Sequence, residues 1–208
     1  MLDVDGVLIR GRPSDGRTWS ADMEADLGIT AEVLGRHFFR PYWQDIVNGR
    51  AALVECLTHV LPAFAPAALT VEALIAYWFE QDSRLDQAVL DDMASLRAEG
   101  IAIHLVTNQE HMRARYIMDV LDLATRVDGM FYSAALGCSK PDAAFFAEVA
   151  RRAGHPAGGL LLVDDTAKNV EGAIEAGWSA VHWTGSERLL EVCDRASRVA
   201  DGSASHPA

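Results

Sequence analysis

Positive charge is scarce in this sequence. Its 208 residues include 18 lysines and arginines but 30 aspartates and glutamates, which gives a net charge of -12 at pH 7. A protein of this charge repels the phosphates of nucleic acids and of anionic lipids. We therefore predict neither a nucleic-acid partner nor a membrane partner.

Cysteine and long apolar segments are also scarce. The three cysteines, Cys56, Cys138 and Cys193, are odd in number and lack C-x-x-C spacing, so a disulfide framework is not expected. No apolar run approaches the roughly 18 to 20 residues that span a bilayer, and the first residues do not show the pattern of a secretory signal. These absences together predict a cytoplasmic protein.

The sequence does have the composition of a folded domain. Half of its residues are hydrophobic and 23% are charged, which is ordinary for a globular protein. A chain of 208 residues is long enough for one domain, or for one domain with a sizeable insertion.

The region from residue 20 to residue 85 has helical spacing and shows no strand-like alternation. Ser20 and Thr30 are suited to cap the first two helices, because their hydroxyl groups can accept a hydrogen bond from the first turn. Residues 9–19, which precede this block, contain the glycines and the proline of turns. We predict a separate helical unit inserted after the first strand, with helices at 20–27, 30–39, 51–61 and 71–81.

After residue 86 the pattern changes to an alternation of helices and strands. Short apolar runs, such as 101–106 and 160–163, are typical of strands that are buried on both faces. This alternation predicts an α/β fold with a parallel sheet covered by helices on both faces. The expected strands are 101–106, 129–132, 160–163 and 178–183, and the expected helices are 87–99, 109–123, 141–153, 167–176 and 187–198.

The first eight residues contain two aspartates two positions apart. In an extended segment Asp3 and Asp5 point to the same side, and Gly6 then allows a turn. Two neighbouring anions are costly to bury without a partner, and each raises the pKa of the other. The pair therefore indicates the floor of a metal or phosphate site, although Asp-x-Asp-Gly alone is equally compatible with a surface turn.

Polar residues also end two other predicted strands. Thr107 and Asn108 follow one of them, and Asp164 and Asp165 follow another. Ligands of parallel α/β sheets bind beyond the carboxyl ends of the strands, so one crevice can receive these residues together with the first acid pair. Lys140 precedes a predicted helix and can lean over that crevice. Each residue alone has an ordinary explanation as a strand end, a helix cap or a loop lysine, and only their combination favours a site.

Four segments in this order resemble the motifs of the haloacid dehalogenase-like hydrolase superfamily. They are Asp3-Val4-Asp5-Gly6-Val7-Leu8, Thr107-Asn108, Lys140-Pro141-Asp142 and Asp164-Asp165. The resemblance covers nearly the whole chain and implies a Rossmann-like parallel sheet core with an all-helical cap inserted after the first motif. We expect residues 1–13 and 86–208 to form the core and residues 14–85 to form the cap. Asp5 indicates the phosphatase branch, because a dehalogenase carries no acid at that position.

The resemblance implies roles for the acidic residues. Asp3 would be the nucleophile that attacks phosphorus and forms an aspartyl-phosphate, and Asp5 would protonate the leaving alcohol and later activate water. A Mg²⁺ ion would be held by Asp3, by the main-chain carbonyl of Asp5 and by Asp165. Asp164 would be a water-bridged partner of the ion, and the order of Asp164 and Asp165 is left open.

The resemblance also implies which residues contact the phosphoryl group. These are Gly6, Thr107, Asn108 and Lys140, of which Thr107 and Lys140 are also catalytic candidates. A carboxylate that approaches a phosphate dianion is repelled, so the site must supply positive charge. Lys140 and the metal ion supply it where water is excluded.

The predicted function is that of a Mg²⁺-dependent phosphatase acting on a small phosphorylated metabolite. The alternative is a phosphotransferase, such as a sugar phosphomutase, that uses the same intermediate, and a third possibility is a non-catalytic ligand-binding module. The substrate and the oligomeric state are left open. Only Met1 and Leu2 precede Asp3, whereas strands usually run about five or six residues. We therefore expect a short central strand and a natural start upstream of Met1.

Overall fold

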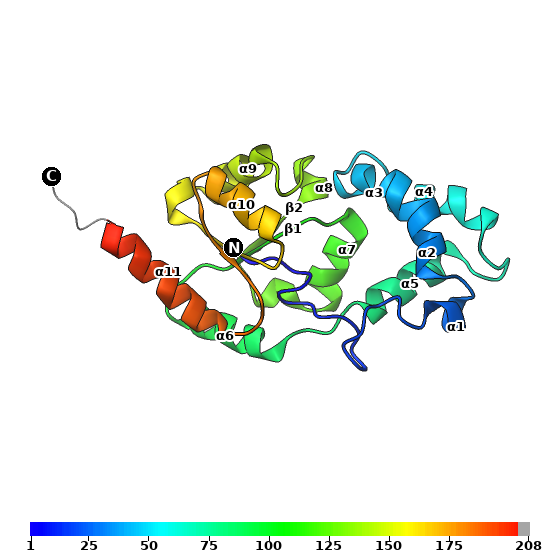
Figure 1. The fold of residues 1–208 in the computed structure, drawn as a ribbon, viewed down its shortest axis with the longest axis horizontal. Coiled ribbons are helices and arrows are strands. Elements are labelled where there is room, and N and C mark those ends of the chain that lie inside the picture. The colour runs from blue at the N-terminus through cyan, green and yellow to red at the C-terminus, as the bar shows by residue number, and fades with distance from the viewer. Residues whose placement is uncertain (204–208) are drawn as a thin grey trace.

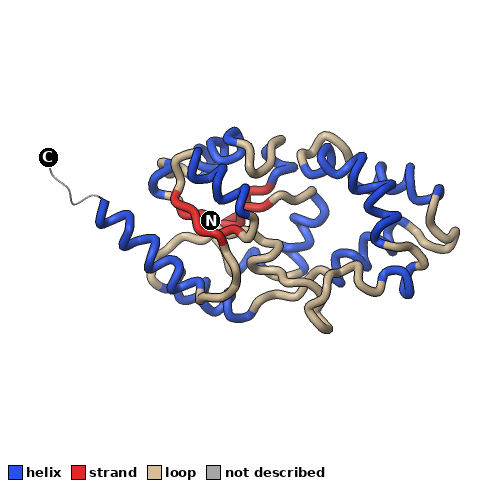
Figure 2. The backbone as a smooth tube through the Cα atoms, viewed as in Figure 1, coloured by secondary structure: helices blue, strands red, loops and turns tan. Residues whose placement is uncertain are grey.

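A parallel sheet assembles around the first three residues of the chain. The computed structural model describes residues 1–203, in which β1 (His104–Thr107) pairs with β2 (Gly129–Tyr132) and β3 (Leu161–Asp164) pairs with β4 (Ser179–His182). Leu2 bridges the two pairs, because its N–H donates to the His104 carbonyl at 2.9 Å while the Asp3 N–H donates to the Val163 carbonyl at 2.9 Å. The order across the sheet is therefore β2, β1, residues 1–3, β3 and β4, with every neighbour parallel. Figure 2 shows the strands gathered between the helices of the core.

Helices cover both faces of this sheet. Figure 1 shows α6 (Gln87–Ala98) and α11 (Leu189–Ser203) on one side, and α9 (Ala143–Ala153) and α10 (Ala167–Glu175) on the other. The core on the α9 side contains Phe145 and Phe146, both fully buried. Burial of such a side chain stabilises the fold by roughly 1.5–3 kcal/mol. The predicted α/β fold with a covered parallel sheet is confirmed.

The inserted block is entirely helical. It contains α1 (Met23–Leu27), α2 (Ala31–Leu34), α3 (Arg40–Val47), α4 (Leu53–Val60) and α5 (Val71–Gln81), which lie on the right of Figure 1. Its buried side chains form a hydrophobic cluster of their own. Trp78 lies at the centre of the aromatic part, stacked on Trp19 at 5.4 Å between ring centroids. The predicted helical cap is confirmed, whereas its boundaries at residues 13 and 86 stay a prediction.

Two helix ends in the cap differ from the expected ones. The first helix begins at Met23 rather than at residue 20, and Asp22 rather than Ser20 is its N-cap residue. The helix that Thr30 caps does not end near residue 39, because a π-helical segment (Gly35–Phe39) carries it into α3. This wider turn accommodates Pro41, which lacks the N–H that a regular α-helix would use there.

The strand and helix limits in the core differ in a similar way. The apolar run 101–106 is only partly a strand, because the Ile103 N–H donates to Asp128 Oδ2 at 2.7 Å instead of to a neighbouring strand. Ile101 is 46% exposed as a result. Pro141 lies outside α9, which begins at Ala143 after the N-cap residue Asp142.

Two short helices and several single turns complete the described structure. Helix α7 (His111–Arg115) follows β1 and continues as a π-helical segment (Tyr116–Val120), and α8 (Ser133–Leu136) follows β2. Short 3₁₀ turns cover Leu61–Ala63, Leu123–Thr125 and Ala157–Gly159. None of the helices within residues 1–203 is both long enough and apolar enough to cross a membrane.

Candidate active site

A buried lysine lies where the strand ends converge. Lys140 Nζ is 3.0 Å from Asp3 Oδ1 and 2.5 Å from Asp164 Oδ2, and it donates to the Val106 carbonyl at 2.9 Å. Its side chain is 1% exposed. The segments that begin the chain, end β3 and precede α9 are therefore brought into direct contact, although they lie far apart in the sequence.

Three carboxylates form a cluster beside this lysine. Asp3, Asp164 and Asp165 each place one oxygen within 4.8 Å of the others. Hard oxygen donors at this spacing fit a magnesium ion. The other observation that favours a cation is the charge, because within this cluster three carboxylates face the single ammonium of Lys140.

The two adjacent acids at the end of β3 have different surroundings. Asp164 is buried and accepts hydrogen bonds from Lys140, from the Thr166 N–H at 2.9 Å and from Asn169 Nδ2 at 3.0 Å. Asp165 is exposed toward the site, and Thr166 Oγ1 donates to its Oδ1 at 3.2 Å. Asp165 therefore keeps more lone pairs for a cation, while Asp164 holds Lys140 in place.

Burial and mutual repulsion change the acidity of the acids in this site. Burial raises the pKa of Asp3 to about 7. The nearby charge of Lys140 lowers this pKa, and the negative charge of Asp164 raises it. Asp5 opens to the cleft, yet neighbouring groups desolvate its carboxylate and raise its pKa as well, against the opposing charges of Arg113 and Lys140. The site therefore disfavours its own negative charge, which a bound cation would offset.

Gly6 lets the main chain turn directly beside Asp165. Its φ is +81°, and a Cβ atom at this position would stand 1.9 Å from Asp165 Oδ2. A side chain at residue 6 would therefore displace the carboxylate, in addition to the strain of a left-handed backbone.

Thr107 is the last residue of β1 and Asn108 follows it, at the carboxyl end of the strand. Thr107 is 1% exposed. Asn108 Nδ2 donates to the Lys140 carbonyl at 2.9 Å, and the Lys140 N–H donates to Asn108 Oδ1 at 2.8 Å. The Asn108 side chain thus holds the backbone that carries Lys140, and the part of Asn108 in substrate binding stays a prediction.

The structure adds residues that the sequence reasoning missed. Gln109 Nε2 donates to Asp5 Oδ2 at 2.5 Å, and Gln109 is 4% exposed. Arg113 is fully buried four residues later, and its Nη1 donates to the Phe79 carbonyl at 3.0 Å. Gln109 directly follows Thr107-Asn108, but nothing in the sequence distinguishes it from an ordinary loop residue.

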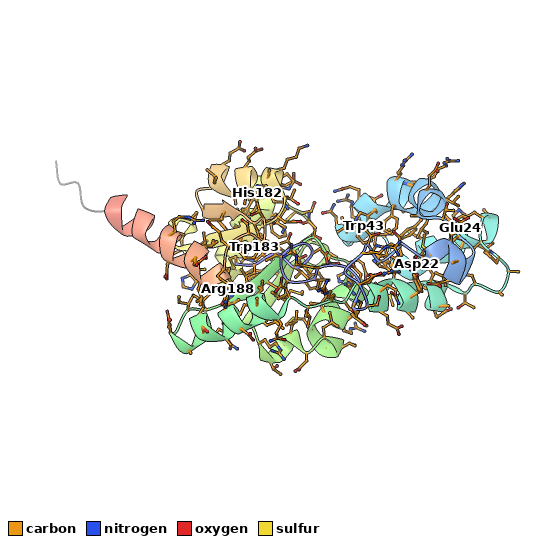
Figure 3. The ribbon with its side chains drawn as sticks, turned by 60° about the horizontal axis from the view of Figure 1, so that its bottom comes forward. Asp22, Glu24, Trp43, His182, Trp183 and Arg188 are labelled. Carbon is orange, nitrogen blue, oxygen red and sulfur yellow. The ribbon has the colours of Figure 1, made fainter. Side chains whose placement is uncertain are left out.

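A cleft opens beside these groups. It has a volume of about 520 Å³, and Asp5, Gly6 and Asp165 lie on its walls together with Ile9, Arg10, Trp19 and Trp183. Figure 3 shows Trp183 in the core, with Trp43 across from it in the cap. The cleft therefore joins the acid cluster to aromatic side chains.

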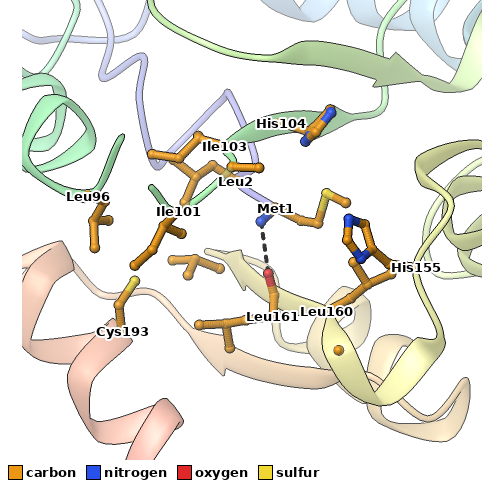
Figure 4. Close-up of a pocket in the computed structure, with 13 residues that line it drawn as sticks. Met1, Leu2, Leu96, Ile101, Ile103, His104, His155, Leu160, Leu161 and Cys193 are labelled. Atoms are coloured by element: carbon orange, nitrogen blue, oxygen red, sulfur yellow. Dashed lines mark hydrogen bonds between the residues drawn. The ribbon is translucent and has the colours of Figure 1, made fainter. Parts of the chain in front are cut away.

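A second cavity of about 360 Å³ lies at the opposite end of the strands, near the residues that begin β1, β3 and the chain itself (Figure 4). The Met1 ammonium donates to the Leu161 carbonyl at 2.9 Å there, and most of the lining is apolar. None of the site residues predicted from the sequence lines it. Of the two, only the first cleft has predicted site residues, Asp5, Gly6 and Asp165, in its lining.

Comparison with known proteins places these residues in a family. A family model described as haloacid dehalogenase-like hydrolase matches residues 1–177. A curated relative, the sesquiterpene phosphatase astK of Aspergillus oryzae, is 29% identical over 194 residues, which cover 89% of this chain and 89% of that protein.

Two solved structures have the same fold. The family enzyme bt-2542 of Bacteroides thetaiotaomicron, in complex with magnesium and inorganic phosphate, matches with a TM-score of 0.75 and 16% identity over 92% of this chain and 96% of that one. A HAD-like family hydrolase from Porphyromonas gingivalis matches with a TM-score of 0.73 and 20% identity over 95% of this chain and 96% of that one.

Substitution of Gly6 tests the turn beside Asp165. We predict that Gly100→Ala costs about 1 kcal/mol of stability because of its positive φ, and that Gly6→Ala costs more, because a clash adds to the same backbone strain. Only Gly6→Ala meets a carboxylate, since no atom lies within 4 Å of a Cβ at Gly100. Chemical denaturation with and without Mg²⁺ should show that Gly6→Ala alone loses stabilisation by the ion. Equal stabilisation of both variants would contradict this account of Gly6.

Proposed function

The chain belongs to the haloacid dehalogenase-like hydrolase family, and from this we propose that it is a Mg²⁺-dependent phosphatase that hydrolyses a small phosphorylated metabolite. The observation that carries the proposal is the position of the Lys140 ammonium, 3.0 Å from Asp3 Oδ1 and beside the carboxylate cluster. A nucleophilic carboxylate needs such a positive group, because the phosphate that it attacks is also an anion.

The proposed reaction uses an aspartyl-phosphate intermediate. Asp3 attacks phosphorus, and Asp5 gives a proton to the leaving alcohol and then removes one from the attacking water. The cleft wall that contains Asp5 supports this division of roles, because Asp5 faces the ligand space while Asp3 is buried beside Lys140. Two carboxylates in different surroundings are suited to different roles.

The remaining residues bind and orient the phosphoryl group and the metal ion. Lys140, Thr107 and the main-chain amide of Asn108 hold the phosphoryl oxygens, and Gly6 permits their close approach to the backbone. A Mg²⁺ ion held by Asp3, Asp165 and the Asp5 carbonyl, with Asp164 as a bridged partner, would neutralise charge on the phosphoryl group. The free acceptor capacity of Asp165 supports its assignment as the direct ligand.

We further propose that the part of the leaving group next to Trp19 is apolar. Trp19 and Ile9 form an apolar part of the cleft lining, whereas Arg10, Thr18 and Asp82 make other parts polar. Trp19 is fixed by stacking on Trp78. Rigid aromatic walls bind hydrocarbon surface with little entropic cost. The name of the relative astK, a sesquiterpene phosphatase, supports the same substrate class.

The metal requirement is the first test of this function. We expect release of inorganic phosphate from p-nitrophenyl phosphate with Mg²⁺, loss of release with EDTA, and no release by Asp3→Asn under either condition. Phosphate release that is unaffected by EDTA would contradict the metal assignment. Formation of an isomerised sugar phosphate without free phosphate would instead indicate a phosphotransferase, and binding without turnover would indicate a ligand-binding module.

Removal of the buried ammonium is the second test. We predict that Lys140→Met lowers kcat by roughly 10²- to 10³-fold, because Asp3 and the phosphoryl group lose their positive partner. Lys168→Met is the matched control, since Lys168 is exposed on α10. Circular dichroism of both variants checks that they are folded. Near-normal turnover by folded Lys140→Met would exclude the proposed role of this lysine.

The substrate class is the third test. Farnesyl phosphate should be hydrolysed with a lower KM than glucose 6-phosphate, and Trp19→Ala should raise the KM for farnesyl phosphate roughly tenfold through lost aromatic contact. Trp43→Ala is the matched control, because Trp43 also packs on Trp78 but does not line the cleft. A preference for the sugar phosphate, or equal effects of the two substitutions, would contradict an apolar leaving group.

A further inference from the structure

We propose that Gln109 is a positioning residue that orients the Asp5 carboxylate and links this orientation to the contact between cap and core. The inference rests on the proposed phosphatase function, in which Asp5 serves the leaving group. Gln109 is buried at the end of β1, and its Nε2 donates to Asp5 Oδ2 at 2.5 Å. One carboxylate oxygen is thereby occupied, so the other is the oxygen that can face the substrate.

The orientation matters in the step that releases the alcohol. An oxygen of Asp3 forms a bond to phosphorus, the bond from phosphorus to the ester oxygen breaks, and its electron pair goes to that oxygen. The proton of Asp5 passes to the same oxygen, so a neutral alcohol leaves and an aspartyl-phosphate stays on Asp3. A misdirected Asp5 would leave an alkoxide, which is a far poorer leaving group.

Gln109 is also held by the place where the cap meets the core. Its carbonyl accepts from the Ala134 N–H at 3.2 Å and lies 3.3 Å from Ser133 Oγ, and Ser133 Oγ donates to the Val47 carbonyl at 2.5 Å. Val47 ends α3 of the cap, whereas Ser133 begins α8 of the core. A Cβ at Gly49 would stand 2.4 Å from the Ala134 carbonyl oxygen, so the two parts are in close contact here.

Arg113 cannot replace Gln109 in this role. Its guanidinium donates to the carbonyls of Phe79 and Asp82, and it lies over the Phe79 ring at 5.2 Å from the centroid. The donor groups of Arg113 are therefore engaged by the end of α5 in the cap. A neutral amide also suits Asp5 better than a charged donor, because a charged partner would hold the carboxylate as an anion more strongly.

Leaving-group dependence distinguishes positioning of Asp5 from a purely structural role. p-Nitrophenolate is a weak base and leaves without being protonated. The farnesyl oxygen is strongly basic, so it must receive a proton as it leaves. We expect Gln109→Asn and Gln109→Leu to lower kcat/KM for farnesyl phosphate roughly ten- to a hundredfold, and to change it less than about threefold for p-nitrophenyl phosphate. Gln109→Asn keeps the amide but is one methylene shorter, so it retains polarity while losing the contact with Asp5.

Gln87→Leu is the matched control. Gln87 Nε2 also donates to an aspartate, Asp91 Oδ1 at 2.7 Å, but on the exposed surface of α6. This variant should leave kcat/KM unchanged for both substrates. Ser133→Ala, which removes the contact with Val47, should shift the ratio of the two kcat/KM values in the same direction as Gln109→Asn by a smaller factor.

The outcomes separate this inference from the function on which it rests. Wild-type protein that is inactive on both esters overturns the phosphatase proposal and the role of Gln109 with it. Active wild-type protein whose Gln109→Asn and Gln109→Leu variants lose both activities equally, or lose neither, overturns only the role of Gln109. An unchanged ratio in Ser133→Ala overturns the link to the cap. A crystal structure of Gln109→Asn in which the Asp5 carboxylate keeps its orientation would also contradict the proposal.

Discussion

The buried ammonium of Lys140 is the interaction on which the arrangement of the site depends. Transfer of a charge out of water costs several kcal/mol, which is offset only if partners of opposite charge are well placed. Asp3 and Asp164 provide these partners, and the Val106 carbonyl takes a further hydrogen bond. Asn108 holds the Lys140 backbone at both its N–H and its carbonyl, while Asp3, Asp164 and the Val106 carbonyl hold the ammonium.

The sheet makes this pairing possible. Residues 1–3 lie between β1 and β3, so three neighbouring segments bring their carboxyl ends to one place. The pairing of this first segment is short, but it is central, and its hydrogen bonds to both neighbours set the position of Asp3. The cap does not contribute to the lysine's contacts, and it approaches the site through α3 and α5 instead.

The sequence was most informative where local pattern and chemistry coincide. Apolar runs that stop at polar residues predict both a strand and a site, and the polar ends of β1 and β3 accordingly lie together. Helix ends were less predictable, because Asp22 and Ser20 are both common N-cap residue types. Asp22 precedes the helix without a side-chain capping bond, since its carboxylate accepts from Arg12 and Arg17 instead. The π-helical turn before Pro41 could not be foreseen, since proline usually ends a helix instead of following a wider turn.

Contacts between segments were the least predictable part of the site. Gln109 contacts Asp5, which is 104 positions away in the sequence, only because the fold brings the two together. The same holds for Arg113, whose partners belong to the end of α5. A motif consists of residue types that a particular chemistry requires. Gln109 and Arg113 depend instead on their position in the folded chain, so their residue types alone do not reveal a role in the site.

The ends of the first and third strand segments explain why neighbouring acids have different partners. Asp164 is the last residue of β3 and turns inward to Lys140 and Asn169, whereas Asp165 lies just beyond the strand, where the chain bends, and turns toward the cleft. Asp3 and Asp5 would share a side in a continuous strand, but the chain turns after Val4, whose carbonyl accepts from the N–H groups of residues 8 and 9. The turn therefore separates a buried carboxylate beside Lys140 from an accessible one on the cleft wall.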